Sequence, residues 1–221
     1  MGQTLAVSGL WTLYKPVEYF QPPAEWRGQP DSGGPILINL IHEIDLMHHL
    51  VGPIVRVQAE RGPDITKVRG TKHKAESGAA VTLRFANGAV GTFLLADNTP
   101  SPFNFESGTG ENPTIPQTGL DFYRIFCSNG VLSVPDMRIW RYETEKGISK
   151  SWTEQLLEER SEVPELKTPF ELQVAHFLKV ISGEEEPSCS GKDGVRALIV
   201  CNAVKEAIEK GSAINIGVDH L

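Results

Sequence analysis

The middle of the chain alternates between apolar and polar residues with a period of two, and this pattern restricts the fold more than any other feature. It predicts six strands, over Ile54–Arg61, Ala79–Phe85, Ala89–Ala96, Phe122–Ser128, Gly130–Pro135 and Arg138–Tyr142. Asn87-Gly88 and Asn129-Gly130 are typical of the tight turns that join antiparallel strands. The sequence therefore predicts a largely antiparallel sheet.

Helical patterns lie on both sides of this region. Apolar residues recur at helical spacing in three segments, Ile36–Val51, Phe170–Ile181 and Gly191–Lys210. A glycine follows each segment and predicts its end. Thr4–Tyr14 and Ile214–Ile216 predict two more strands. Strands grouped together and flanked by helices indicate an α+β fold, with the helices packed on one face of the sheet.

The chain of 221 residues is long enough to bury one large core, and we expect residues 1–221 to form a single domain. Two segments rich in Pro and Gly interrupt the pattern. The segment 15–35 is too long for a passive connector, which favours a substrate-binding loop, with an ordinary surface loop as the alternative. The segment 97–119 predicts a flexible loop that leaves the sheet.

Charge and composition exclude several classes of partner. The net charge is −7 and the basic residues are scattered, which argues against nucleic acid or an anionic membrane as the partner. No apolar stretch approaches the length that a bilayer crossing needs. Cys127, Cys189 and Cys201 are odd in number and widely spaced, which fits a reducing, cytoplasmic location.

The first predicted helix has one apolar arc and one polar arc. Asn39, His42, Asp45 and His49 share the polar arc. An imidazole exchanges a proton near neutral pH, so His42 is a candidate general acid or base. Asp45 lies three residues after His42 and four before His49, and it could orient either ring. A solvated histidine and an exposed ion pair are the alternatives.

A metal site on this arc is not expected. His42, Asp45 and His49 are metal-ligating residue types on one helix face. However, Leu46 occupies the position at which a His-Glu-x-x-His zinc motif needs its second histidine. We therefore predict no metal.

Three stretches occur in the order known from one enzyme family. They are the helix Gly33–Asp45, the hairpin Gly78–Phe93 and the segment from Pro169 to Gly194. Together they resemble the C-terminal domain of the glucose-fructose oxidoreductase, inositol dehydrogenase and MocA (Gfo/Idh/MocA) family. The resemblance covers nearly the whole chain.

This resemblance implies an NAD(P)-dependent dehydrogenase of the CH–OH class that acts on a sugar, a polyol or a related hydroxy compound. It makes His42 the catalytic residue and makes Asn39, Asp45 and His49 substrate contacts. In the loop, Trp26-Arg27 could stack on and hydrogen-bond to a sugar, although an arginine beside a tryptophan is also ordinary surface cover.

The chain departs from the family at three points. Members begin with a Rossmann domain, but no Gly-x-Gly-x-x-Gly motif occurs and the residues before the first strand are too few for a βαβ unit. NAD or NADP is thus expected on a separate Rossmann partner. Ile38 stands where many members have an aspartate, and Asn39 could contact a substrate hydroxyl instead. Lys15-Pro16 follows a strand, and we do not assign it the role of the family's catalytic lysine.

Two functions stay open. The chain is either a substrate-binding domain that is inactive without a Rossmann domain, or a non-catalytic sugar-binding or oligomerisation module of the same ancestry. Ala79–Phe85 and Ala89–Ala96 carry apolar residues on both alternations, so the second face of the sheet is predicted to meet another copy in a homo-oligomer.

Overall fold

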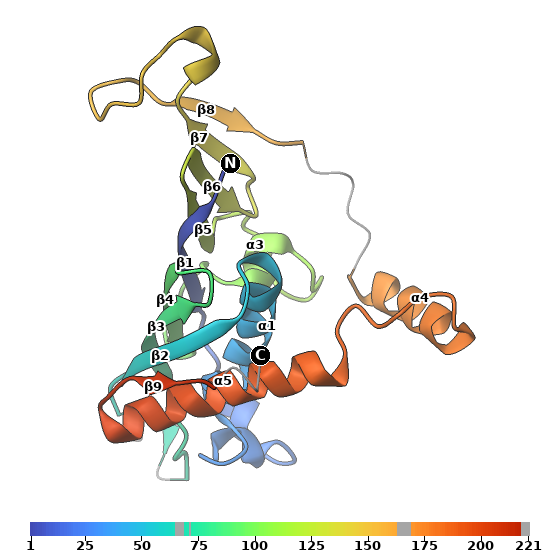
Figure 1. The fold of residues 1–221 in the computed structure, drawn as a ribbon. Helices are drawn as coiled ribbons and strands as arrows, with labels where there is room; N and C mark the ends of the chain where they lie inside the picture. The colour runs from blue at the N-terminus through green and yellow to red at the C-terminus, as the bar shows by residue number, and fades with distance from the viewer. Residues whose placement is uncertain (65–68, 71, 163–168, 218–221) are drawn as a thin grey trace.

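The computed structural model describes residues 1–64, 69–70, 72–162 and 169–217, and its centre is a nine-stranded sheet. The strands are β1 (Thr4–Thr12), β2 (Ile54–Arg61), β3 (Gly78–Phe85), β4 (Val90–Ala96), β5 (Tyr123–Cys127), β6 (Gly130–Val134), β7 (Arg138–Arg141), β8 (Leu157–Arg160) and β9 (Ile214–Asn215). Their order across the sheet is β8-β7-β6-β5-β1-β4-β3-β2-β9 (Figure 1). Among these strands β1 and β4 pair in parallel, and all other neighbours are antiparallel.

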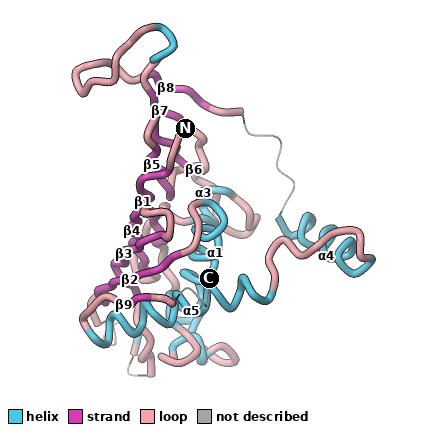
Figure 2. The backbone as a smooth tube through the Cα atoms, viewed as in Figure 1, coloured by secondary structure: helices cyan, strands magenta, loops and turns pink. Residues whose placement is uncertain are grey.

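The helices gather on one side of this sheet (Figures 1 and 2). A π-helix, Ile36–Leu40, continues directly into α1 (Ile41–Leu50), and both contact the long helix α5 (Gly191–Lys210), which also contacts β2. The short helix α3 (Phe105–Thr109) lies within the segment 97–119. The α+β prediction, with helices on one face, is confirmed.

The core lies between the helices and the inward-facing residues of the sheet. Alternate residues of β3 are buried, among them Val81 and Leu83, because successive side chains of a strand point to opposite faces. From the helical layer, Ile44, Met47 and Val204 are fully buried against them. The apolar stripes of the sequence therefore form one contiguous core.

The helix α4 (Pro169–Ser182) stands apart from the sheet in Figure 1. None of its residues is buried, and apolar side chains such as Phe177 and Ile181 are exposed. None of the helices in the described part of the chain combines the length and the apolar character that a membrane crossing needs.

One expectation from the sequence needs correction. The segment Ile36–Val51 is not one regular α-helix, because its first turn, Ile36–Leu40, is a π-helix. Within the segment 97–119, for which the sequence predicts a flexible loop, the structure has the helix α3, preceded by the fully buried Asn104. The sequence does not reveal either element, because the π-helix and the short helix α3 each span too few residues for their apolar side chains to show a repeat.

Candidate functional site

The π-helix, α1, α3 and β1 enclose a cavity of about 450 Å³. Its lining combines apolar side chains from Trp11, Ile38, Leu46 and Phe105 with a polar set. The polar set consists of Asn39, His42, Glu43, Asp45, Glu106 and Glu111. This cavity is the candidate site, because it holds the predicted catalytic histidine.

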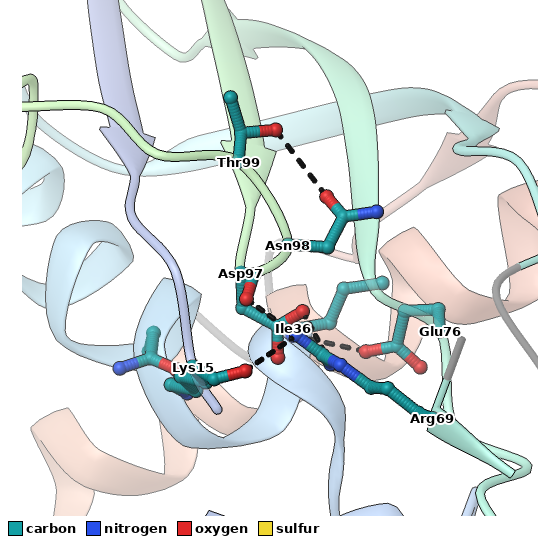
Figure 3. A network of polar contacts seen from close by, with 8 residues as sticks. Lys15, Ile36, Arg69, Glu76, Asp97, Asn98 and Thr99 are labelled. Atoms are coloured by element: carbon teal, nitrogen blue, oxygen red, sulfur yellow. Dashed lines mark hydrogen bonds and ion pairs between the residues drawn. The ribbon is translucent and has the colours of Figure 1, made fainter. Parts of the chain in front are cut away.

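The start of the π-helix is fixed by Glu76, which is buried just before β3. Its carboxylate accepts a hydrogen bond from the backbone N–H of Ile36 at 3.0 Å (Figure 3), and a negative charge at this end of a helix is favourable. Gly34 allows the approach, because its φ is +79° and a Cβ there would lie 2.2 Å from Glu76 Oε1. The glycine pair of the sequence motif thus seats the helix that carries Asn39.

Lys15 is buried next to Asn39. Its Nζ donates a hydrogen bond to Asn39 Oδ1 at 2.6 Å and lies 5.0 Å and 4.7 Å from the ring centroids of Trp11 and Tyr19. Burial lowers the pKa of Lys15 from 10.5 to about 8, although nearby Asp97 partly opposes the shift. Lys15 therefore loses its proton at a lower pH than a lysine on the protein surface does.

The backbone around Lys15 is held on both sides. Its N–H donates to the carbonyl of Asp97 at 2.8 Å, and its carbonyl accepts from Arg69 Nη2 at 3.4 Å (Figure 3). Arg69 Nη1 also pairs with the Asp97 carboxylate at 2.7 Å, and both side chains are almost fully buried. This network fixes the chain just beyond β1 and hence the position of the lysine.

Glu43 is a buried carboxyl on α1, only 3% exposed, and its Oε2 has no hydrogen-bond partner within the described residues. Burial, with the charges of Glu106 and Glu111, holds the pKa of Glu43 well above its ordinary value. A carboxyl in this environment retains its proton at higher pH than a surface glutamate.

The segment around α3 supplies the other wall of the cavity. Asn104 caps α3 by accepting a hydrogen bond from Ser107 N at 2.8 Å, and its Nδ2 donates to the carbonyl of Thr12 at 3.1 Å. Trp11 Nε1 donates to Glu106 at 3.0 Å and 3.3 Å from its two carboxylate oxygens. Burial, then the charge of Glu106, raises the pKa of Glu111.

The structure brings together three of the six predicted site residues. Asn39, His42 and Asp45 line the same cavity. The exposed His49 instead lines a second cavity of about 360 Å³, in which Asp45 also takes part. The residues of the polar arc therefore line two different cavities.

Trp26 and Arg27 lie outside the lining of the site cavity. Arg27 donates to the carbonyl of Tyr19 at 3.2 Å, and its guanidinium group lies 4.1 Å from the centroid of the Tyr19 ring. The same ring contacts Lys15, so the loop is linked to the site through Tyr19. Trp26 is half-exposed.

Sequence reasoning missed Lys15, Glu43, Glu106 and Glu111. One of them carried a readable signal, because Glu43 lies three residues after Leu40 and four before Met47, both on the apolar arc. An acidic residue at a packed helical position indicates a buried polar group. The others depend on contacts between distant parts of the chain.

The described residues do not fit a dinucleotide site. A pyrophosphate site of this kind needs a glycine-rich turn between a strand and a helix. The parallel pair β1 and β4 is instead connected through α1, β2 and β3, and the sequence has no Gly-x-Gly-x-x-Gly. The residues around His42 offer a cavity with hydrogen-bonding side chains and an imidazole that can accept a proton.

Comparison with known proteins identifies the family. Residues 1–216 match the family described as "Oxidoreductase family, C-terminal alpha/beta domain". A comparison with curated proteins gives no match.

Several solved structures share the fold. The WlbA dehydrogenase from Bordetella pertussis in complex with NADH and UDP-GlcNAcA is 21% identical, with a TM-score of 0.67 over 99% of this chain and 56% of that chain. Levoglucosan dehydrogenase in complex with NADH is 17% identical, with a TM-score of 0.70 over 98% and 59%. The aldose-aldose oxidoreductase from Caulobacter crescentus complexed with glycerol is 18% identical, with a TM-score of 0.68 over 98% and 56%. This chain thus spans a little over half the length of these proteins.

Proposed function

We propose a substrate-binding role for this chain, because it belongs to the Gfo/Idh/MocA oxidoreductase family, whose C-terminal alpha/beta domain it matches over residues 1–216. The similar structures include dehydrogenases in complex with NADH and an oxidoreductase complexed with glycerol. The substrate would be a sugar, a polyol or a related hydroxy compound. NAD or NADP would be held by a nucleotide-binding domain in addition to this one.

One observation carries the proposal: Lys15 orients Asn39 in the cavity that also contains His42. An ammonium group can only donate, so the amide oxygen of Asn39 faces Lys15 and its Nδ2 group is left to donate to a substrate oxygen. His42 is exposed in the first turn of α1 and takes the proton of the substrate hydroxyl as the alcohol is oxidised.

The other predicted substrate contacts differ in the size of substrate that each one can reach. Asp45 lies at the wall shared by the two cavities, so it can meet a substrate bound beside His42. His49 reaches only a substrate that extends past Asp45. Trp26 and Arg27 do not line the cavity, and Arg27 is linked to the site only through Tyr19, so in this proposal they contact only a larger substrate.

Activity of the chain combined with a nucleotide-binding domain of the family tests this role. Reduction of NAD⁺ or NADP⁺ is followed by absorbance over a panel of sugars and polyols. We expect His42→Asn to lower kcat by roughly 10²- to 10⁴-fold, the usual contribution of a general base. His49→Asn, on the same helix but in the other cavity, is the matched control and should retain most of the activity. Full activity of His42→Asn would contradict the role of His42.

The outer face of the sheet supports the second predicted role, assembly into a homo-oligomer. Val90, Leu94 and Phe126 are apolar residues on this face with 44%, 49% and 37% exposure. Exposed apolar residues on a sheet face are suited to contact between copies. Light scattering coupled to size exclusion should give a dimer or larger species, and Leu94→Glu should shift it to the monomer. A monomeric wild-type chain at micromolar concentration would contradict this role.

A cytoplasmic location is part of the same proposal. The three cysteines are free, and Cys201 is buried where no partner sulfur reaches it. Free thiols persist in reducing compartments. Fractionation of cells that express the tagged protein would test the location.

A further inference from the structure

The cavity at His42 is strongly acidic. Carboxyl groups enter it from both walls, Glu43 and Asp45 from α1, and Glu106 and Glu111 from α3 and the residues after it. His42 is the one basic side chain among the described residues that line it. Lys15 forms a hydrogen bond with Asn39 but does not itself line the cavity.

Three of these four carboxyl groups form no ion pair with a described residue, although the ammonium group of Lys15 lies close enough to interact with the charge of Glu106. Within the described residues, Glu43, Glu106 and Glu111 take part in none of the ion pairs. Glu106 is instead held by the neutral indole N–H of Trp11 at 3.0 Å. The negative charge of the cavity is therefore available to a ligand.

Glu43 points independently to a ligand. It is 3% exposed, it lines the cavity, and its buried Oε2 has no partner in the described structure. Buried polar atoms in proteins are nearly always hydrogen-bonded. A hydrogen-bonding group of a bound molecule would supply the missing partner.

We propose that this cavity selects a hydroxy compound that carries a protonated amino group, such as an amino sugar, and disfavours compounds that carry a carboxylate or a phosphate. The inference rests on the proposed function and adds the charge of the substrate to it. The acidic side chains of Glu106 and Glu111 attract an ammonium group, and its N–H donors match their acceptor oxygens. No three of the described His, Cys, Asp and Glu side chains are arranged to hold a metal ion, so an organic ammonium is the cation that fits.

The test compares three sugars of similar size that differ in charge. Glucosamine, glucose and glucuronate are titrated into the full ¹⁵N-labelled chain, and binding is followed by shifts of the amide signals around His42 and Glu106. We expect glucosamine to bind about tenfold more tightly than glucose at low salt, and glucuronate more weakly than glucose. Glu106→Gln and Glu111→Gln should reduce the preference for glucosamine, whereas Glu154→Gln, an exposed control, should keep it.

The outcomes separate this inference from the proposed function. If glucose and glucosamine bind equally, or if glucuronate binds at least as tightly, the charge preference is overturned and the hydroxy-compound site stands. If none of the three sugars shifts the signals around His42, the proposed function fails, and the inference fails with it. Preference for glucosamine that persists in both glutamine variants would also overturn the role of the carboxylates.

Discussion

Lys15 Nζ donates a hydrogen bond to Asn39 Oδ1 at 2.6 Å, although the two residues belong to different elements and are 24 positions apart. The bond decides which end of the amide faces the cavity. With an aspartate in this place the side chain would accept a hydrogen bond from the substrate, whereas the held asparagine donates one. Lys15 is therefore a positioning residue that acts through Asn39.

Replacement of Lys15 by methionine tests this relationship. Without the ammonium group the amide of Asn39 loses its fixed orientation, so we expect KM for the hydroxy substrate to rise about tenfold, with a smaller change in kcat. Lys150→Met is the matched control, because Lys150 also donates to an asparagine, Asn129, at 2.6 Å but on an exposed hairpin. Steady-state kinetics of the complemented enzyme provide the measurement. An unchanged KM would refute the positioning role.

The lowered pKa of Lys15 predicts a pH dependence of stability. Between about 8 and 10.5, the folded and unfolded values, the unfolded chain binds more protons at this residue than the folded chain. The free energy of unfolding of the wild type should therefore rise across this window, relative to Lys15→Met, by up to about 3 kcal/mol. Urea denaturation of both proteins at several pH values measures the difference. A constant difference would show that Lys15 titrates as it does in the unfolded chain.

The raised pKa of Glu43 predicts the opposite trend in acid. Above its ordinary value of 4.5, the folded protein binds more protons at Glu43 than the unfolded chain. Stability should then fall as pH rises, until the pKa of the folded state is reached. Glu43→Gln should lack this fall and become the more stable protein at neutral pH. If the free energies of unfolding of the two proteins change equally with pH from 4.5 upward, the burial of the carboxyl is contradicted.

Trp11 joins the sheet to α3 and should contribute to stability. It is 1% exposed and donates to Glu106, so Trp11→Phe leaves both a smaller side chain and a carboxylate without its donor. We expect a loss of about 1–3 kcal/mol in the free energy of unfolding. Trp152→Phe is the control, because Trp152 is 94% exposed and should change stability by less than about 0.5 kcal/mol. Equal stabilities of the two variants would contradict the role of Trp11.

The elements of this fold could be predicted because their signals are local. Strand β2 and helix α5 begin and end at the predicted residues, Ile54–Arg61 and Gly191–Lys210. In α5 the first turn carries its own cap, since Ser190 and Asp193 form reciprocal hydrogen bonds between side chain and backbone. Strand β8, Leu157–Arg160, was missed, because its short stretch of charged residues shows no alternation.

In the candidate site, too, some features follow from the local sequence and others from tertiary contacts. The sequence by itself determined the helix with His42 and the polar arc that includes Asn39 and Asp45, because helical spacing sets which residues share a face. Only the tertiary structure decided that Lys15 would form a hydrogen bond with Asn39 and that Glu106 of α3 would line the cavity. It also decided that His49 would line a different cavity. Trp11 and Glu106 are 95 positions apart, and their contact depends on the packing of the whole sheet. No periodicity along the chain encodes such a contact, because its cause is the shared core and not the local backbone.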